Sequence, residues 1–318
     1  MNILLASVGR RVKLLQYFKA EWAGLGQVVA VDCDEAAPAL YVADRFEIVP
    51  RIDSPGYIDA LLEICKRHEI TVVLSLIDPE LVVLSRNKEA FLSEKVQVVV
   101  SDSTITEMCL DKWTMYQCLQ ECGIPCIPTY NHLTTATEAL STGTLSFPLL
   151  IKPRSGSASQ GIRRADSYSD LQTACSQIGE VVIQPYVSGD EFGVDAYVDL
   201  ISAEPVAIFN KKKLRMRAGE TDKSLAVRDE RLTELVLKTL RAVKPVGPID
   251  VDCFYTPQGF VVSEMNPRFG GGYPHAHECG YNFVRYLLRN LQGRANDSCL
   301  AGQPEGSVML KYDQIMIV

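Results

Sequence analysis

Short apolar runs alternate with helix-like segments over the first hundred residues of this 318-residue chain. A sequence that alternates in this way folds as a parallel sheet whose strands are joined by crossover helices. We therefore predict an open α/β domain over residues 1–104. Its buried strands are expected where the apolar residues run together, at 2–7, 27–32, 71–77 and 96–100.

Open sheets bind ligands at the carboxyl ends of their strands. Asp32 ends the second predicted strand, and Asp78-Pro79-Glu80 follows the third. Each of these acids is a candidate ligand contact, although loops and helix caps also favour acidic residues. The first turn, at 7–11, lacks the full GxGxxG fingerprint, so a dinucleotide cofactor is the weaker interpretation.

The pattern changes beyond residue 122. A helical segment is predicted near 104–122, and Gly123-Ile124-Pro125 then marks the start of a second region. Strand-like runs cluster there with few helices between them, which favours antiparallel sheet in an α+β arrangement. Strands are predicted near 147–152, 160–164, 180–184, 192–199, 205–212, 248–255 and 260–266, and helices near 168–177, 228–244 and 279–291.

The composition excludes some classes of function. The chain has 32 Lys and Arg against 39 Asp and Glu, and its net charge of -7 disfavours a nucleic-acid partner. No apolar stretch approaches the roughly 20 residues of a membrane span, and the first apolar run is too short for a signal peptide. We expect a cytoplasmic protein whose 10 cysteines are free thiols or buried apolar residues.

A hairpin late in the sequence brings acidic side chains together. Its strands are joined by the turn 256–259, and alternation puts Asp250 and Asp252 on one face of the first strand and Glu264 and Asn266 on one face of the second. The register leaves Glu264 opposite either aspartate. Opposed carboxylates repel, nothing in the local sequence neutralises them, and Mg²⁺ prefers such oxygen ligands. A solvated acidic face is the alternative.

A second candidate segment combines basic residues with a loop of small ones. An apolar strand delivers Lys152 and Arg154, which could hold negative oxygens, and the following loop could cradle phosphates with its backbone N–H groups. The loop differs from a Walker A sequence, and a plain connector is the alternative. The loop positions expected to contact phosphate are Gly156, Ser157, Ser159 and Gly161.

A third segment follows the predicted strand at 180–184. The Pro185 carbonyl and the Val187 N–H could pair with adenine, next to Gln184 and Tyr186, while Glu191 beyond the next glycine could take a ribose hydroxyl. A strand that ends in a turn is the alternative.

These three segments, with Asp111-Lys112 ahead of them, resemble the ATP-grasp superfamily, and within it the carbamoyl-phosphate-synthetase-like, carboxylate-amine ligase branch. The resemblance covers residues 105–318, and the first hundred residues resemble the pre-ATP-grasp domain. It implies an ATP-grasp domain with a small lobe at about 123–187 and a large lobe at about 188–318. The Ser-rich phosphate loop and Gln184, where many members have Glu, depart from the family pattern.

The resemblance also implies a role for each candidate residue. Lys112 and Lys152 would contact the nucleotide phosphates, and Arg268 would support the transferring phosphate. Adenosine would be held by Gln184, Pro185, Val187 and Glu191. The ligands of Mg²⁺, with Mn²⁺ as a possible substitute, would be Asp250, Glu264 and Asn266.

The implied reaction starts when a small-molecule carboxylate attacks the γ-phosphate of ATP. An amine then displaces phosphate from the acyl phosphate, so Mg²⁺, Lys152 and Arg268 should matter more than any general base. A carbamate- or bicarbonate-activating enzyme and a nucleotide-binding regulator without ligation remain as alternatives. A homodimer is possible.

Basic residues and two histidines remain outside these segments. His275 and His277 flank a glycine triplet and are expected to contact or support the substrate rather than a metal. A mobile loop lining the acceptor pocket is predicted for the basic residues, with a solvated hairpin as the alternative. These residues are Lys211, Lys212, Lys213, Arg215 and Arg217.

Overall fold

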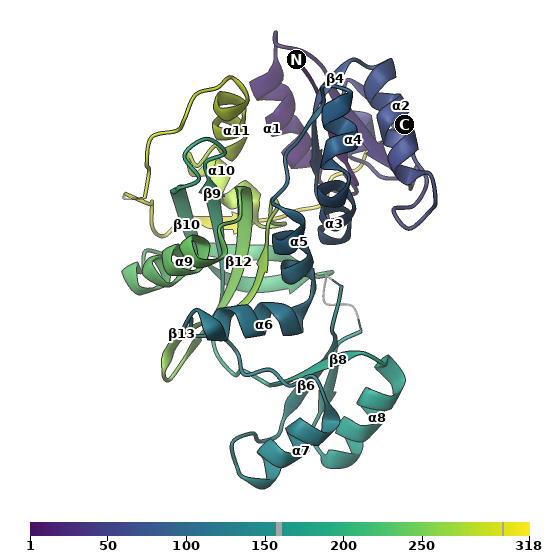
Figure 1. Ribbon diagram of the computed structural model, residues 1–318. Helices are drawn as coiled ribbons and strands as arrows, with labels where there is room; N and C mark the ends of the chain where they lie inside the picture. The colour runs from purple at the N-terminus through teal and green to yellow at the C-terminus, as the bar shows by residue number, and fades with distance from the viewer. Residues whose placement is uncertain (157–160, 301) are drawn as a thin grey trace.

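A five-stranded sheet forms the N-terminal domain in the computed structural model, which describes residues 1–156, 161–300 and 302–318 (Figure 1). All of its strand pairs are parallel, as predicted, and their order is β3-β2-β1-β4-β5. The strands are β1 (Asn2–Ala6), β2 (Val28–Asp32), β3 (Arg45–Ile48), β4 (Ile70–Ser75) and β5 (Gln97–Val98). The helices are α1 (Val12–Trp22), α2 (Tyr57–Arg67), α3 (Asp78–Arg86) and α4 (Lys88–Ser93), with a 3-10 turn at Leu40–Val42.

A small antiparallel lobe projects from the opposite end of the molecule (Figure 1). Its strands follow the order β7-β6-β8, and two helices pack beside them. The elements are α7 (Leu133–Ser141), β6 (Leu149–Pro153), β7 (Arg163–Ala165), α8 (Tyr168–Ile178) and β8 (Val181–Pro185). Every residue of its apolar core lies between 130 and 183, so the lobe shares this core with no other part described.

A six-stranded sheet forms the large lobe, in the order β13-β12-β9-β10-β11-β14. Its strands are β9 (Glu191–Val198), β10 (Pro205–Arg217), β11 (Glu220–Ala226), β12 (Gly247–Thr256), β13 (Gly259–Asn266) and β14 (Val308–Leu310). Its helices are α9 (Glu230–Val243), α10 (Tyr273–Glu278) and α11 (Phe283–Leu291). The antiparallel pairing expected of the second region is confirmed in both lobes.

The helical segment predicted near 104–122 is present, but it is divided into two helices, α5 (Ser103–Leu110) and α6 (Lys112–Glu121). Asp111 between them has extended backbone, and its carboxylate accepts hydrogen bonds from the N–H groups of Trp113 and Thr114. Aspartate in that role starts a new helix rather than continuing the old one.

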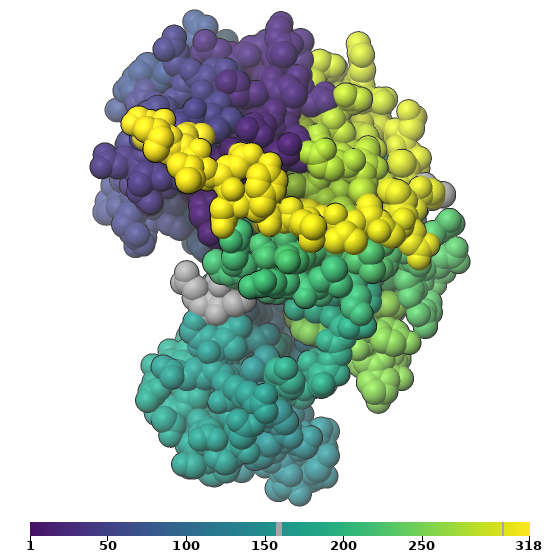
Figure 2. All heavy atoms as spheres, turned by 180° about the vertical axis from the view of Figure 1, so that it is seen from behind, coloured from purple at the N-terminus to yellow at the C-terminus, as the bar shows by residue number. Residues whose placement is uncertain are grey.

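The N-terminal domain and the large lobe share one apolar core. Phe18 and Trp22 on α1 pack in the same cluster as Phe269, Phe283 and other large-lobe residues. The C-terminal segment lies across the boundary between these two units (Figure 2). No helix in the described part of the chain is long and apolar enough to span a membrane.

Candidate active site

The β12–β13 hairpin carries four oxygen-bearing side chains on one face, as predicted. Asp250 lies opposite Asn266, and Asp252 lies opposite Glu264. Directly opposed residues of an antiparallel pair point to the same side, and so do residues two apart. We call Asp250, Asp252, Glu264 and Asn266 the acidic face. Of the two registers left open by the sequence, the one that pairs Glu264 with Asp252 is present.

The expectation that nothing in the local sequence neutralises these acids is wrong. The Lys213 ammonium lies 2.7 Å from the Asp252 carboxylate, and the Arg268 guanidinium lies 3.4 Å from Asp250. The lysine comes from β10, which reaches β12 only across β9. Local sequence could not reveal the pairing of Lys213 because it depends on the order of strands that are distant in the chain, whereas Arg268 lies only two residues beyond Asn266.

Glu264 and Asn266 differ from the two aspartates. The ion pairs within the described residues leave Glu264 without a basic partner, and no side-chain hydrogen bond is made there by Asn266. Burial raises the pKa of Glu264, while Lys112 and Lys152 nearby oppose this rise. These hard oxygen donors fit Mg²⁺. No three His, Cys, Asp or Glu side chains in the described ranges are grouped as a metal site, so phosphates would have to complete the coordination.

The small lobe contributes Lys152 from β6. Burial and the neighbouring Lys112 lower the pKa of the Lys152 ammonium, and Glu264 and Glu191 oppose this. Lys112 at the start of α6 donates to the carbonyl of Gly156, 2.7 Å away, at the beginning of the predicted phosphate loop. The two lysines therefore lie on the side of the site that faces Glu264.

The other candidate phosphate contacts are Arg154 and the residues of the predicted phosphate loop. Arg154 makes a bidentate pair with Asp111, at 2.9 and 2.6 Å, so its guanidinium is occupied by protein. At Gly161, φ is +72°, and a Cβ would come within 2.9 Å of the Pro153 ring, which explains the glycine. Ser157 and Ser159 lie outside the described residues.

The predicted adenine segment lies at the end of β8. Gln184 is buried, its amide donates to the Thr129 hydroxyl at 2.8 Å, and its Oε1 has no partner among the described residues. The Tyr186 N–H bonds to the Pro148 carbonyl at 2.9 Å, and the Tyr186 ring is 44% exposed. Val187 lies just beyond this bond. Its role, like those of Pro185 and Glu191, stays a prediction.

Arg268 contacts residues that are far apart in the sequence. Its guanidinium lies 2.9 Å from Asp78, the first residue of α3 in the N-terminal domain, and donates to the Phe269 carbonyl at 3.1 Å. Although burial opposes charge, Asp78 and Asp250 raise the pKa of Arg268. The sequence marked Asp78 only as an acid after a strand, because its partner is 190 residues away.

A cavity of about 830 Å³ adjoins the acidic face. Gly270 and Gly271 line it, and a Cβ on Gly270 would come within 2.6 Å of the Asp250 carboxyl group. Arg11 also lines it and donates to the carbonyl of Phe269 at 3.0 Å, the same oxygen that Arg268 contacts. The cavity wall and Arg268 are therefore linked through the Phe269 carbonyl. Its other walls come mainly from α1, α10, β11 and the C-terminal residues 307–316.

The basic segment differs from the prediction, because it is part of strand β10 rather than a mobile loop. Of its residues only Arg217 lines the cavity. Lys211 is 1% exposed and forms an ion pair with Asp195, so it lies inside the protein. The hairpin alternative was correct in its topology, although only part of this hairpin faces solvent.

The two histidines have different surroundings. His275 lines the cavity and hydrogen-bonds the hydroxyls of Ser224 and Ser307, at 2.8 and 3.1 Å. His277 stacks on the Tyr17 ring, with 3.5 Å between ring centroids. These two hydrogen bonds fix the His275 ring in the wall of the cavity.

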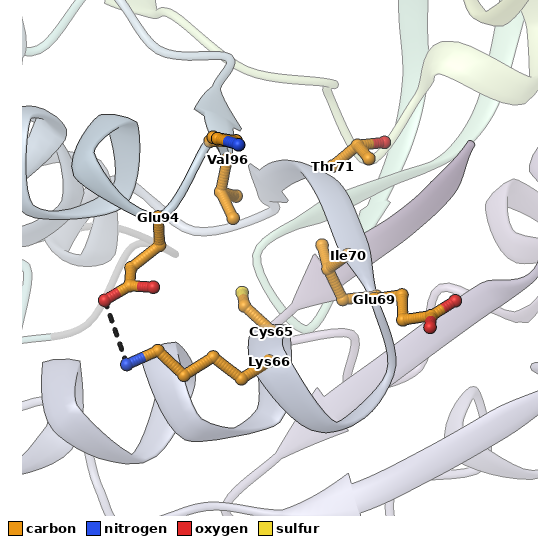
Figure 3. Close-up of a pocket in the computed structure, with 8 residues that line it drawn as sticks. Cys65, Lys66, Glu69, Ile70, Thr71, Glu94 and Val96 are labelled. Atoms are coloured by element: carbon orange, nitrogen blue, oxygen red, sulfur yellow. Dashed lines mark ion pairs between the residues drawn. The ribbon is translucent and has the colours of Figure 1, made fainter.

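A smaller cavity of about 240 Å³ lies on the N-terminal domain (Figure 3). The ion pair of Lys66 and Glu94, 2.9 Å apart, stands at its rim together with Cys65. All its lining residues fall between 65 and 96, so it takes no part in the site described above.

The parallel-sheet domain, the two antiparallel lobes and the acidic face together define a protein of the ATP-grasp fold. The family models agree, since the model described as "PylC-like, N-terminal domain" matches residues 3–99 and the ATP-grasp domain model matches residues 109–272. The chain belongs to the ATP-grasp family.

Two curated proteins show the extent of the sequence similarity. Uncharacterized protein y4rH of Sinorhizobium fredii is 26% identical over 261 residues, which cover 74% of this chain and 52% of that protein. The D-alanine–D-alanine ligase of Corynebacterium urealyticum is 29% identical over 186 residues, 51% of each chain. The chain thus spans about half the length of the curated relatives it matches.

Solved structures share the fold at low identity. The biotin carboxylase domain of Hydrogenobacter thermophilus 2-oxoglutarate carboxylase, in complex with MgADP, ADP and bicarbonate, superposes with a TM-score of 0.77 at 15% identity, over 96% of this chain and 73% of that one. The L-amino acid ligase of Bacillus licheniformis gives 0.69 at 19% identity, over 91% and 73%. N5-carboxyaminoimidazole synthetase of Staphylococcus aureus complexed with ADP gives 0.73 at 18%, over 93% and 78%.

Proposed function

We propose that the chain is an ATP-dependent ligase that activates a small carboxylate as an acyl phosphate for attack by an amine. One observation carries this proposal: the side chains of Glu264 and Asn266 lie on the acidic face without protein partners in the described chain, and Lys112 and Lys152 are near enough to Glu264 to oppose the rise in its pKa that burial causes. Acidic oxygens that face ammonium groups across a site are suited to a magnesium-bound triphosphate.

Different residues would have separate roles in phosphoryl transfer. Lys112 and Lys152 would bind the phosphate oxygens, and Glu264 and Asn266 would hold Mg²⁺ with the help of Asp250. A bound Mg²⁺ would reduce the charge on those oxygens. Such a transfer asks mainly for alignment and charge neutralisation.

Arg268 supports the second half of the reaction. Asp78 and Asp250 hold its guanidinium beside the cavity, where it would stabilise the transferring phosphate and then the acyl phosphate. The cavity lies on the other side of the Gly270 backbone and is large enough for small-molecule substrates. We infer that the carboxylate and the amine bind there.

The relatives support ligation as the class of reaction. A D-alanine–D-alanine ligase is similar in sequence, and an L-amino acid ligase is similar in fold. Both names describe the joining of small molecules that carry a carboxylate and an amine. The particular pair for this chain depends on the residues that line its own cavity.

Release of ADP from Mg·ATP, measured across a panel of amino acids and small acids, tests the proposal. We expect release that requires one acid and one amine together, and loss of it in Lys152→Met and in Glu264→Gln. Lys66→Met, at an exposed ion pair of the N-terminal domain, is the control and should stay active. Release with bicarbonate alone would favour the carbamate-type alternative, and full activity in either site variant would contradict these roles.

A further inference from the structure

Lys213 occupies an unusual position at the acidic face. Its ammonium lies 2.7 Å from Asp252 and 2.8 Å from Glu191, and its side chain is only 5% exposed. Although burial opposes its charge, Asp252 and Glu191 raise the pKa of Lys213, so it stays protonated. The lysine therefore bridges the predicted ribose acid and an acid that faces Glu264.

The strand order makes this bridge possible. β9 separates β10 from β12, and a lysine on β10 must cross it to reach Asp252. Gly193 on β9 has no side chain to block the way: a Cβ there would come within 3.2 Å of the Cε atoms of Lys211 and Lys213. Buried charges need close partners, and the acids supply them.

The other acids of this sheet can be sorted by their partners. Lys211 pairs with Asp195, and Arg268 lies 3.4 Å from Asp250. Among the described residues, Glu264 is the acid of this face that no lysine or arginine pairs with. Glu264 is therefore the acid of this face at which a further cation could bind.

We propose that Lys213 is a built-in cation of the nucleotide site, which neutralises the charges of Asp252 and Glu191 so that the chain binds a single divalent ion with each nucleotide, at Glu264 and Asn266. The inference rests on the proposed function for the location of the nucleotide. An ammonium group and a divalent ion compete for the same carboxylate oxygens, because both are attracted by their negative charge. Each cation binds these oxygens more weakly when the other is present. Removing the ammonium should free Asp252 for a second ion.

Counting bound Mn²⁺ by electron paramagnetic resonance tests this without any turnover. The whole chain is saturated with a non-hydrolysable ATP analogue and titrated with Mn²⁺. We expect one ion per chain in the wild type and two in Lys213→Met, which keeps the length of the side chain but loses the charge. Lys212→Met is the matched control, because Lys212 is 32% exposed and pairs with Asp190 away from the acidic face. It should bind one ion.

Two ions in the wild type would overturn the inference, and that count needs no variant. One ion in a Lys213→Met protein that melts cooperatively and binds the analogue would also overturn it. Lys213→Arg, which retains the charge, should bind one ion, and two would count against the proposal. Absence of analogue binding in the wild type would contradict the proposed function instead, so the two failures are distinguishable.

Discussion

Single residues in the glycine triplet set the distance between the cavity and the acidic face. In Gly270→Ala the new Cβ would lie 2.6 Å from the Asp250 carboxyl group, which must then move and disturb Arg268. We expect ADP release to fall about tenfold or more, since small misplacements at a reacting centre are costly. Gly271→Ala is the comparison, because its Cβ would meet the Glu220 side chain at 2.9 Å, at the cavity wall rather than at the acidic face, and we expect a smaller fall in ADP release. Equal activity in the two variants would contradict this account.

The buried His275 makes the free energy of unfolding depend on pH. Burial and then Lys211 lower the pKa of His275 to about 4, whereas in the unfolded chain it is near 6.5. Between these values the unfolded chain binds more protons, so the free energy of unfolding decreases as pH falls through this window, by a contribution on the order of 3 kcal/mol. Urea unfolding at pH 7 and 4.5 should show a smaller loss in His275→Gln than in the wild type. The same loss in both would exclude the effect.

Among the elements, α6 connects the phosphate site to the rest of the fold. Asp111 caps this helix and also pairs with Arg154, the residue that follows β6. Asp111→Ala should lower the free energy of unfolding by about 1–3 kcal/mol, because it loses both a cap and an ion pair. It should also weaken binding of an ATP analogue in calorimetry. Ser167→Ala removes only the cap of α8 and should cost about 1 kcal/mol without changing that affinity.

Elements with a strong local signal were predictable and the others were not. The β12–β13 hairpin follows from its turn residues and its alternation, both of which are local. β3 was missed because it is an edge strand whose residues are mostly exposed, so it lacks an apolar run. α7 was missed because Leu133–Ser141 is rich in threonine, which is a poor helix former, and buries only two alanines, so it shows no run of large apolar residues. The partners of Lys213 required the order of the strands, which no local pattern gives.

At the scale of the whole molecule, the N-terminal domain contributes directly to the site through Asp78. Asp78→Asn removes the buried negative charge next to Arg268 and keeps an oxygen that can accept a hydrogen bond. We expect ADP release to drop by about 10²-fold, because Arg268 loses its orientation, while analogue binding changes little. Asp102→Asn, at a carboxylate 83% exposed, is the control. An equal loss of analogue binding in Asp78→Asn would show that the substitution disrupts the nucleotide site itself, and would contradict this prediction.

The self-contained core of the small lobe has a consequence for how quickly a nucleotide can leave. Because none of its core residues, all between 130 and 183, packs into another core, the lobe can tilt as one block without exposing apolar surface to water. The barrier to opening then comes from polar links such as the ion pair of Arg154 with Asp111. Residence time of the bound nucleotide should therefore respond to salt far more than to substitutions inside that core.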